Sequence, residues 1–200
     1  TLKNSPSLNK YNFIINKNKL SLIRNNTEIL TIDANETNEY DLISNKILEL
    51  EDSFEKPLFL MKNKMLPFFD TTISNKTNLT HSISLLNIKS IEDFQNKTNQ
   101  KIELQIFRGN IYIDGIQAWE ERNWIGQVIK INNVSFKVEK NIPRCVVINL
   151  KPNTDDDSLN LLQSLKKNYN HFDMGIYLTA LDDGKINIGD TISFSVLDKN

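Results

Sequence analysis

The stretch "GQVIKINNVSFKVEKNIPRCVVINL", residues 126–150, gives the clearest indication of the fold class. Three short apolar, β-branched runs follow one another in it, over 126–131, 134–140 and 144–150, and each predicts a strand. The only cysteine, Cys145, lies in the third run, directly behind Pro143 and Arg144. A buried core thiol is the ordinary explanation for such a cysteine, because free cysteine behaves as a small hydrophobe. The residues around Cys145 must therefore indicate whether its thiol has a chemical role.

Further short strands surround this stretch. Apolar runs predict them over 82–88, 102–107, 110–115, 175–181 and 191–196. A helix is expected over 90–98, and a second one over 155–169, with Asp155 to Asp157 at its positive end and Lys166 and Lys167 near its negative end. Six or more short strands in succession indicate a closed barrel or a sandwich.

The first seventy residues have a different pattern. Apolar stretches separated by Asn and Lys over 11–33 predict two or three antiparallel strands. Apolar residues at intervals of three and four over 36–51 predict an amphipathic helix behind a Thr37 cap. "PLFLM", residues 57–61, is expected to be a buried strand, and 68–81 a polar loop. We therefore expect a mainly β fold with a few helices (α+β), in two domains over 1–70 and 71–200.

Composition excludes several classes of function. The formal net charge is -1 and the charges form no long run of one sign, so nucleic acid and anionic membrane surfaces are not expected partners. The apolar runs are far shorter than the ~20 residues of a spanning helix, and no charged-then-apolar signal segment opens the chain. A single cysteine suits a reducing compartment, so the expected location is cytoplasmic.

The first candidate site is "FRGNIYIDG", residues 107–115. Arg108 and Asn110 are two positions apart, so in an extended segment both point to the same face. A guanidinium beside a carboxamide makes a fork of donors that suits a phosphate, a carboxylate or the edge of a pterin. An arginine that closes a salt bridge at a strand end would give the same spacing.

The second candidate site is "PRCVVINL", residues 143–150. Arg144 supplies positive potential that favours the thiolate of Cys145, the form that binds a soft metal or carries sulfur. One cysteine and two histidines make a structural zinc site nearly impossible. A cysteine-protease mechanism would need His81 or His171 as its base, and neither has a recognisable orienting partner in the sequence.

Four blocks carry a family resemblance. "FRGNIYIDG", "AWEERNWIGQVIKI", "PRCVVINLKPNT" and "DMGIYLTALDDGKINIGD" stand in an order and spacing that resemble the MOSC domain, named for the molybdenum cofactor sulfurase C-terminus. The similarity runs from about Leu79 to Phe194 and includes "THSISLLNIKSIEDF". The family includes the mitochondrial amidoxime-reducing component and related bacterial reductases. The resemblance implies a MOSC-type β-barrel preceded by the latter part of a smaller N-terminal domain.

The resemblance also implies roles for particular residues. Cys145 matches the cysteine that ligates molybdenum in the reductase branch, or that is proposed to bear a persulfide in the sulfur-carrying branch. Arg108 and Asn110 match the family's Arg-x-Asn, and Pro143 and Arg144 match the pair flanking the cysteine. The remaining expected contacts to the cofactor come from Thr80, His81, Ser82 and Tyr177.

This sequence departs from the family in three places. The opening segment that carries a phosphate-binding lysine and arginine has no match, so we expect the chain to be a piece of a longer protein. "KPNTDDD" lacks the glycine that ends the family's turn, and Gly109 stands where proline or alanine is usual. None of these changes removes an expected ligand.

Three functions remain open at this point. The first is a molybdenum-cofactor oxidoreductase that reduces N-oxygenated small molecules, with an electron-donor protein as its partner. The second is a sulfur-carrier or cofactor-delivery module in which Cys145 bears a persulfide, with a sulfurase as its partner. The third is a barrel that has lost the cofactor and keeps Cys145 as packing. Pyridoxal phosphate is not expected, because the chain has no lyase-like domain.

Overall fold

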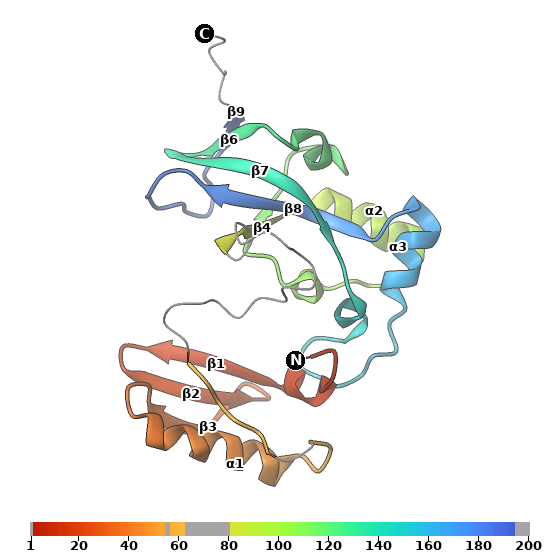
Figure 1. The fold of residues 1–200 in the computed structure, drawn as a ribbon. Coiled ribbons are helices and arrows are strands. Elements are labelled where there is room, and N and C mark those ends of the chain that lie inside the picture. Colours follow the sequence, from red (N-terminus) through yellow and green to blue (C-terminus); the bar gives the residue numbers. More distant parts are fainter. Residues whose placement is uncertain (1, 55–56, 63–80, 195–200) are drawn as a thin grey trace. The chain divides into compact units, whose positions relative to one another are not determined.

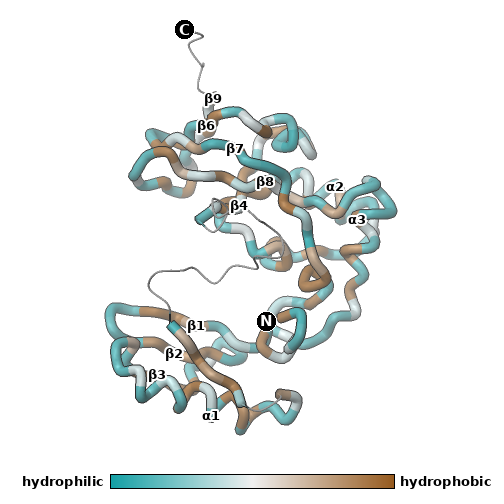
Figure 2. Tube along the Cα trace, in the orientation of Figure 1, coloured by the Kyte–Doolittle hydropathy of each residue, from teal (hydrophilic) through white to brown (hydrophobic). Residues whose placement is uncertain are grey.

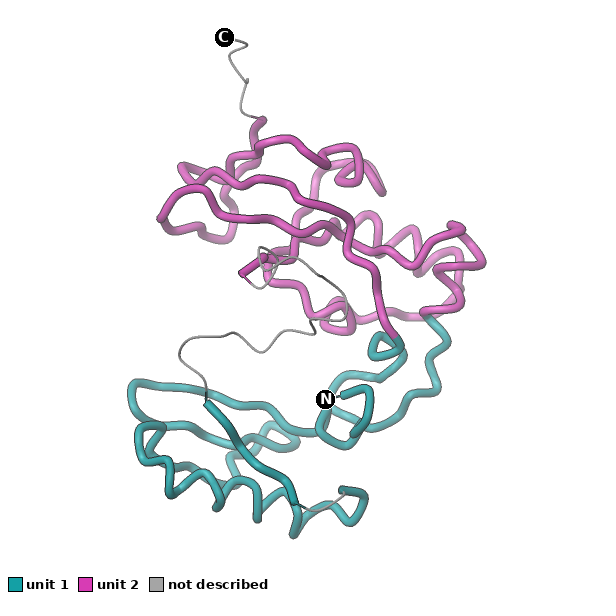
Figure 3. The backbone as a smooth tube through the Cα atoms, in the orientation of Figure 1, with its two compact units in different colours: residues 1–65, 146–161 teal, residues 66–145, 162–200 magenta. Residues whose placement is uncertain are grey.

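The computed structural model describes residues 2–54, 57–62 and 81–194. The chain forms two compact units, residues 1–65 with 146–161 and residues 66–145 with 162–200 (Figure 3). Residues 146–161 fall within the second domain expected from the sequence, yet they group with the first unit. The boundary expected near residue 70 and most of the polar loop expected over 68–81 lie outside the described residues.

The first unit begins with a three-stranded antiparallel meander, as the sequence predicts. After the 3-10 turn η1 (Pro6–Lys10), the strands β1 (Tyr11–Asn16), β2 (Lys19–Arg24) and β3 (Thr27–Asp33) pair in chain order (Figure 1). Asn25 and Asn26 both have positive φ, which is why asparagines form the tight turn between β2 and β3. Leu22 is fully buried at the centre of the sheet.

The predicted amphipathic helix is present as α1 (Tyr40–Leu50), preceded by a short 3-10 turn, η2 (Thr37–Glu39). It buries Tyr40, Ile43 and Ile47, whose spacing of three and four places them on one face against the meander. Glu39 stands at its N-cap, so the prediction of a Thr37 cap was wrong. "PLFLM" was also predicted wrongly: residues 57–61 form no strand, and Phe59 and Met61 are exposed.

The second unit is built on a curled, six-stranded sheet in the order β5-β4-β8-β7-β6-β9. Its strands are β4 (Ile83–Asn87), β5 (Ile111–Ile113), β6 (Val128–Ile131), β7 (Val134–Pro143), β8 (Asp173–Ala180) and β9 (Ile192–Phe194). The β4–β5 pair is parallel, and the other pairs are antiparallel. The sheet is a half-barrel, because no pairing joins the two outer strands, β5 and β9, in the described part of the chain. The expected mainly β, α+β fold class is confirmed.

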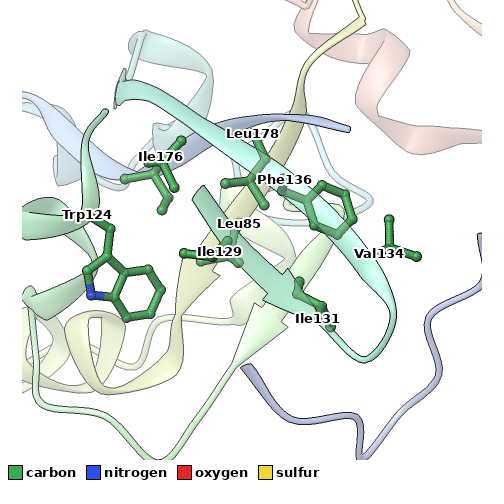
Figure 4. Packing of buried hydrophobic residues seen from close by; sticks show 9 residues of the cluster. Leu85, Trp124, Ile129, Ile131, Val134, Phe136, Ile176 and Leu178 are labelled. Atoms are coloured by element: carbon green, nitrogen blue, oxygen red, sulfur yellow. The ribbon is translucent and has the colours of Figure 1, made fainter. Parts of the chain in front are cut away.

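One hydrophobic cluster of this unit lies on one face of the sheet. Alternate residues of the strands, with Trp124 from the 3-10 turn η5 (Glu120–Trp124), converge there, as Figure 4 shows for Phe136, Ile176 and Leu178. The helices α2 (Ile88–Thr98) and α3 (Leu161–Tyr169) carry hydrophilic residues over much of their surface (Figure 2). Side chains alternate between the two faces along a strand. Tyr177 lies between two buried positions of β8, so its side chain points to the opposite face of the sheet.

Three further expectations from the sequence are corrected here. Residues 104–107 and 146–149 form the 3-10 turns η4 and η6 in place of strands, and they bury Ile106, Phe107 and Ile148 while Leu104 and Val146 stay exposed. The second expected helix begins at Leu161, so the three aspartates 155–157 precede it and do not lie at its N-terminus. Asp156 instead accepts a hydrogen bond from the backbone N–H of Ser158, which closes a turn.

No helix within the described ranges is long and apolar enough to cross a membrane.

Candidate functional site at the end of strand β7

Cys145 lies where strand β7 ends. Pro143 is the last residue of the strand and stands opposite Asp173 of β8, and the backbone N–H of Arg144 donates to the carbonyl of Phe172 at 2.9 Å. Cys145 follows and is partly exposed, and it is not among the buried residues of the described part of the chain. Its surroundings are therefore those of a site residue more than those of core packing.

The Arg144 side chain is held by backbone carbonyls on two other elements. Its Nε donates to the Met174 carbonyl at 2.8 Å, and one terminal nitrogen donates to the Phe107 carbonyl at 2.9 Å. The guanidinium carbon lies 5.5 Å from the centre of the Phe107 ring. Burial lowers the pKa of Arg144 to about 10, so the group stays cationic at neutral pH. Arg144 thus joins the start of β8 to the end of η4 and brings a fixed positive charge to Cys145.

Arg108 contributes a second cation to the same place. It ends η4 in a left-handed conformation, φ 49°, and donates to the Ile106 carbonyl at 2.9 Å. Burial lowers the pKa of Arg108, and electrostatic interactions with Cys145 and Tyr112 act in the opposite direction. Arg108 is therefore within electrostatic reach of Cys145, and it lies at the end of a turn and not on the strand that the sequence predicts.

Two tyrosines lie within electrostatic reach of the two arginines. Burial raises the pKa of Tyr177, and the charge of Arg144 partly offsets this effect. Tyr112, which the sequence analysis did not select, influences the pKa of both arginines. Its spacing two positions beyond Asn110 could have identified it, because side chains at that interval share a face of a strand.

Asn110 has a role that the sequence could not show. Its Oδ1 accepts hydrogen bonds from the backbone N–H of Ser84 at 2.9 Å and from the Ser84 hydroxyl at 2.8 Å. Its own N–H donates back to Ser84. The carboxamide oxygen therefore fastens the segment before β5 to β4, and only the amide nitrogen is available for the predicted donor fork.

The departure at Gly109 has a steric cause. A Cβ atom there would lie 2.1 Å from Leu86 Cδ1, which no packed structure accepts without rearrangement. The Gly109 N–H also donates to the Tyr112 hydroxyl at 2.9 Å, and that hydroxyl donates to the Leu104 carbonyl at 2.9 Å. Glycine at this position lets the loop approach β4 and orients Tyr112.

The segment before β4 is described in part. Ser82 carries a buried hydroxyl oxygen with no hydrogen-bond partner among the described residues, and His81 is exposed. Thr80 lies outside the described residues. An unpartnered buried hydroxyl costs about 1–3 kcal/mol, so Ser82 is suited to a ligand that would satisfy it.

His171 is engaged elsewhere. Its Nδ1 accepts a hydrogen bond from the Asp173 N–H at 3.1 Å, and its ring stacks on Tyr169 with the ring centres 5.8 Å apart. Burial lowers the pKa of His171. These contacts orient the ring for packing and not as the base of a Cys145 nucleophile.

The described residues contain no group of three or more His, Cys, Asp or Glu side chains that could hold a metal ion. The site described here can supply one soft sulfur ligand, two cations and several neutral hydrogen-bonding groups.

A family model described as the MOSC domain matches residues 73–193, which is more than half of the chain. The chain belongs to the MOSC domain family. This family is associated with binding of the molybdenum cofactor.

The chain is also similar to mitochondrial amidoxime reducing component 2 from three mammals. It is 27% identical to the Rattus norvegicus protein over 122 residues, 55% of this chain and 36% of that protein. It is 26% identical to the Bos taurus protein over 143 residues, 65% of this chain and 42% of that protein, and 25% identical to the Macaca fascicularis protein over 142 residues, covering 64% and 42%. The alignments thus span less than half the length of these relatives.

Proposed function

We propose that this chain binds the molybdenum cofactor and forms the cofactor-holding part of a reductase for N-oxygenated small molecules. The observation that carries the proposal is the convergence of Arg108, Arg144 and Tyr177 on Cys145 in a chain of the MOSC family. A thiol beside two cations is matched to a soft metal whose cofactor carries an anionic phosphate. The unpartnered Ser82 hydroxyl supports the same conclusion, because the polar edge of a heterocycle would satisfy it.

Each residue of the site has a distinct role in this proposal. Cys145 supplies the thiolate ligand, Arg108 attracts the phosphate, and Arg144 holds β8 and η4 at the distance that keeps the site open. Tyr177 carries its phenolic proton at neutral pH, and burial raises its pKa further, so its Oη can donate to the substrate oxygen. Pro143, His81 and Thr80 stay predicted contacts.

The cofactor, when bound, supplies two-electron redox chemistry. Reduction of an N–OH group consumes two electrons and two protons and yields N–H and water. The electrons must come from outside the chain, so we propose an electron-donor protein as partner and a small N-hydroxylated molecule as substrate. A reducing compartment such as the cytoplasm would keep Cys145 reduced.

A second function deserves a test because Cys145 is partly exposed. An accessible thiolate beside two cations can also carry a persulfide, which a sulfurase partner would load. In that case the chain would deliver sulfur without reducing a substrate.

One preparation separates the two functions. The chain is produced in a host that makes the cofactor, and molybdenum content, pterin content and intact mass are measured together with reduction of an aromatic amidoxime by a reduced viologen. Bound molybdenum with amidoxime reduction supports the reductase. A mass increase of one sulfur at Cys145 with no molybdenum supports the carrier, and the absence of all these signals contradicts both.

A further inference from the structure

We propose that Tyr112 is a positioning residue, whose hydroxyl group joins the two ends of the turn that carries Arg108 and so fixes the place of the Arg108 side chain. The inference rests on the proposed function only in taking Arg108 as the group that attracts the anionic phosphate. Every contact that carries it lies within one compact unit, residues 66–145 with 162–200.

The Tyr112 hydroxyl bonds to the backbone on both sides of Arg108. It donates its proton to the carbonyl of Leu104, the first residue of η4, at 2.9 Å. It accepts a hydrogen bond from the backbone N–H of Gly109, the residue after Arg108, also at 2.9 Å. One oxygen atom therefore links the first residue of the turn to the residue that follows Arg108.

The backbone of Arg108 needs such support. Its φ of 49° and ψ of 44° lie in the left-handed region, which is unfavourable for a residue with a Cβ atom and persists where surrounding contacts hold it. The Arg108 N–H donates to the Gln105 carbonyl at 3.0 Å, and the Asn110 N–H donates to the Ser84 carbonyl at 3.1 Å. Together with the Tyr112 hydroxyl, these bonds fix the backbone before and after Arg108.

The ring of Tyr112 is held close to this turn. A Cβ atom at Gly109 would lie 3.0 Å from Cζ of the ring, so the ring packs directly against the Gly109 backbone. Tyr112 belongs to β5 and stands opposite Leu86 of β4. The hydroxyl is therefore carried by a paired strand of the sheet, and it fastens the turn to that strand.

The direction of the hydroxyl proton distinguishes Tyr112 from Tyr177. A phenol has one proton to donate, and the proton of Tyr112 is directed at the Leu104 carbonyl, so it is not available to a substrate. Burial lowers the pKa of Arg108, and electrostatic interactions with Cys145 and Tyr112 partly offset this effect. The guanidinium thus lies within electrostatic reach of the thiol, and Tyr112 acts on the site through Arg108.

The test removes one oxygen atom and measures the positive potential at Cys145. Tyr112→Phe deletes the hydroxyl and keeps the ring, Arg108→Gln removes the charge, and a third variant combines the two changes. Tyr40→Phe is the matched control, because it deletes a hydroxyl that donates to the Ala34 carbonyl at 2.8 Å in the other compact unit. Alkylation of Cys145 in the full chain without cofactor is followed by mass spectrometry with anionic iodoacetate and with neutral iodoacetamide. Amide hydrogen exchange is measured in parallel.

The ratio of the iodoacetate rate to the iodoacetamide rate reports the charge near the thiol. The thiolate fraction and the accessibility of the thiol affect both reagents alike, so they cancel in the ratio. A fixed cation, in contrast, favours only the anionic reagent. A change that only loosens the structure would alter both rates and leave their ratio unchanged.

We expect the ratio to fall about threefold in Arg108→Gln and about twofold in Tyr112→Phe. The combined variant should match Arg108→Gln, because Tyr112 has no charge to position once the guanidinium is gone. Exchange in Tyr112→Phe should increase over 104–110 and stay unchanged in β8, and Tyr40→Phe should alter neither the ratio nor the exchange over 104–110.

An unchanged ratio in Tyr112→Phe would overturn the proposal, whether or not exchange increases. So would a combined variant whose ratio falls below that of Arg108→Gln, since Tyr112 would then act by another route. An unchanged ratio in Arg108→Gln would overturn it too, because the thiol would not sense the charge that Tyr112 is inferred to position. None of these readouts requires molybdenum, so the result stands apart from that of the reductase proposal.

Discussion

At the scale of single residues, the site depends on side chains that bond to the backbone. Arg144 donates to the carbonyls of Met174 and Phe107, and Asn110 accepts from Ser84. These two residues match family positions expected to face the cofactor, yet in this structure they first fix the elements that surround it. Their positions can be read from sequence, but the carbonyls they bond cannot, because those carbonyls come from other parts of the chain.

Arg144→Lys should destabilise the second unit although it keeps the charge. A lysine ammonium cannot reproduce the planar fork that reaches two carbonyls, and each hydrogen bond from a charged group contributes about 1.5–3 kcal/mol. We expect the free energy of unfolding in urea to fall by about 2 kcal/mol. Arg122→Lys is the control, since Arg122 makes a single contact of 3.3 Å with Asp173 and should lose less than about 1 kcal/mol. Equal losses in the two variants would contradict the role given to Arg144.

Glu121 should make stability depend on pH. It is fully buried and accepts hydrogen bonds from Asn87 at 2.9 Å and from Ser90 at 2.9 Å. Burial raises the pKa of Glu121 in the folded chain above the ordinary value of 4.5. At pH values between 4.5 and this raised pKa, the folded chain therefore binds more protons than the unfolded chain. The contribution of Glu121 to the stability of the wild type should therefore decrease as pH rises from about 4.5 through the raised pKa.

The measurement compares urea unfolding of the wild type with that of Glu121→Gln from pH 4 to pH 8. The wild type should lose stability relative to the variant as pH rises through this window, while other titrating groups cancel in the difference. A constant difference across the window, or one of opposite sign, would show that Glu121 does not titrate as described.

At the scale of elements, the close approach of β4 and β8 shapes the face that carries Tyr177. Gly175 of β8 has a φ of 82°, and a Cβ atom there would lie 2.5 Å from the Leu85 carbonyl oxygen of β4. A backbone atom cannot move aside as the end of a side chain can. This position therefore requires glycine for both conformation and space.

Gly175→Ala should unfold or strongly destabilise the second unit, by about 3 kcal/mol or more, because strain and a backbone clash act together. Gly115→Ala is the matched control: its φ is 87°, but no atom lies within 4 Å of the added Cβ. It should lose only about 1 kcal/mol from the backbone conformation. Thermal unfolding of the two variants measures the difference, and similar melting temperatures would contradict this account.

The sequence predicted most strands and helices because their apolar residues recur at the period of the element. The meander, α1, α2 and the strands β4 to β9 follow this pattern. It failed at 102–107 and 144–150, where apolar runs form 3-10 turns, and at Asp155 to Asp157, which lie in the turn before α3. In each case hydrogen bonds between segments distant in sequence determine the local structure. The spacing of apolar residues along the sequence does not reveal such bonds.

At the scale of the whole molecule, Cys145 lies at the passage of the chain from one compact unit to the other. The family match covers residues 73–193, so residues of both units contribute to the matched region. The sequence predicted the family, which the family model confirms, while the bonds of the Arg144 guanidinium to the Met174 and Phe107 carbonyls required the structure.

The most direct test of the account is the molybdenum content of Cys145→Ser, produced beside the wild type in a host that makes the cofactor. Serine has nearly the same shape, but its hard hydroxyl is a poor ligand for a soft metal, so the fold should survive while metal ligation fails. We predict that molybdenum bound per chain falls at least about tenfold, with a thermal melting temperature close to that of the wild type. Wild-type molybdenum content in Cys145→Ser would contradict the assignment of Cys145 as the metal ligand.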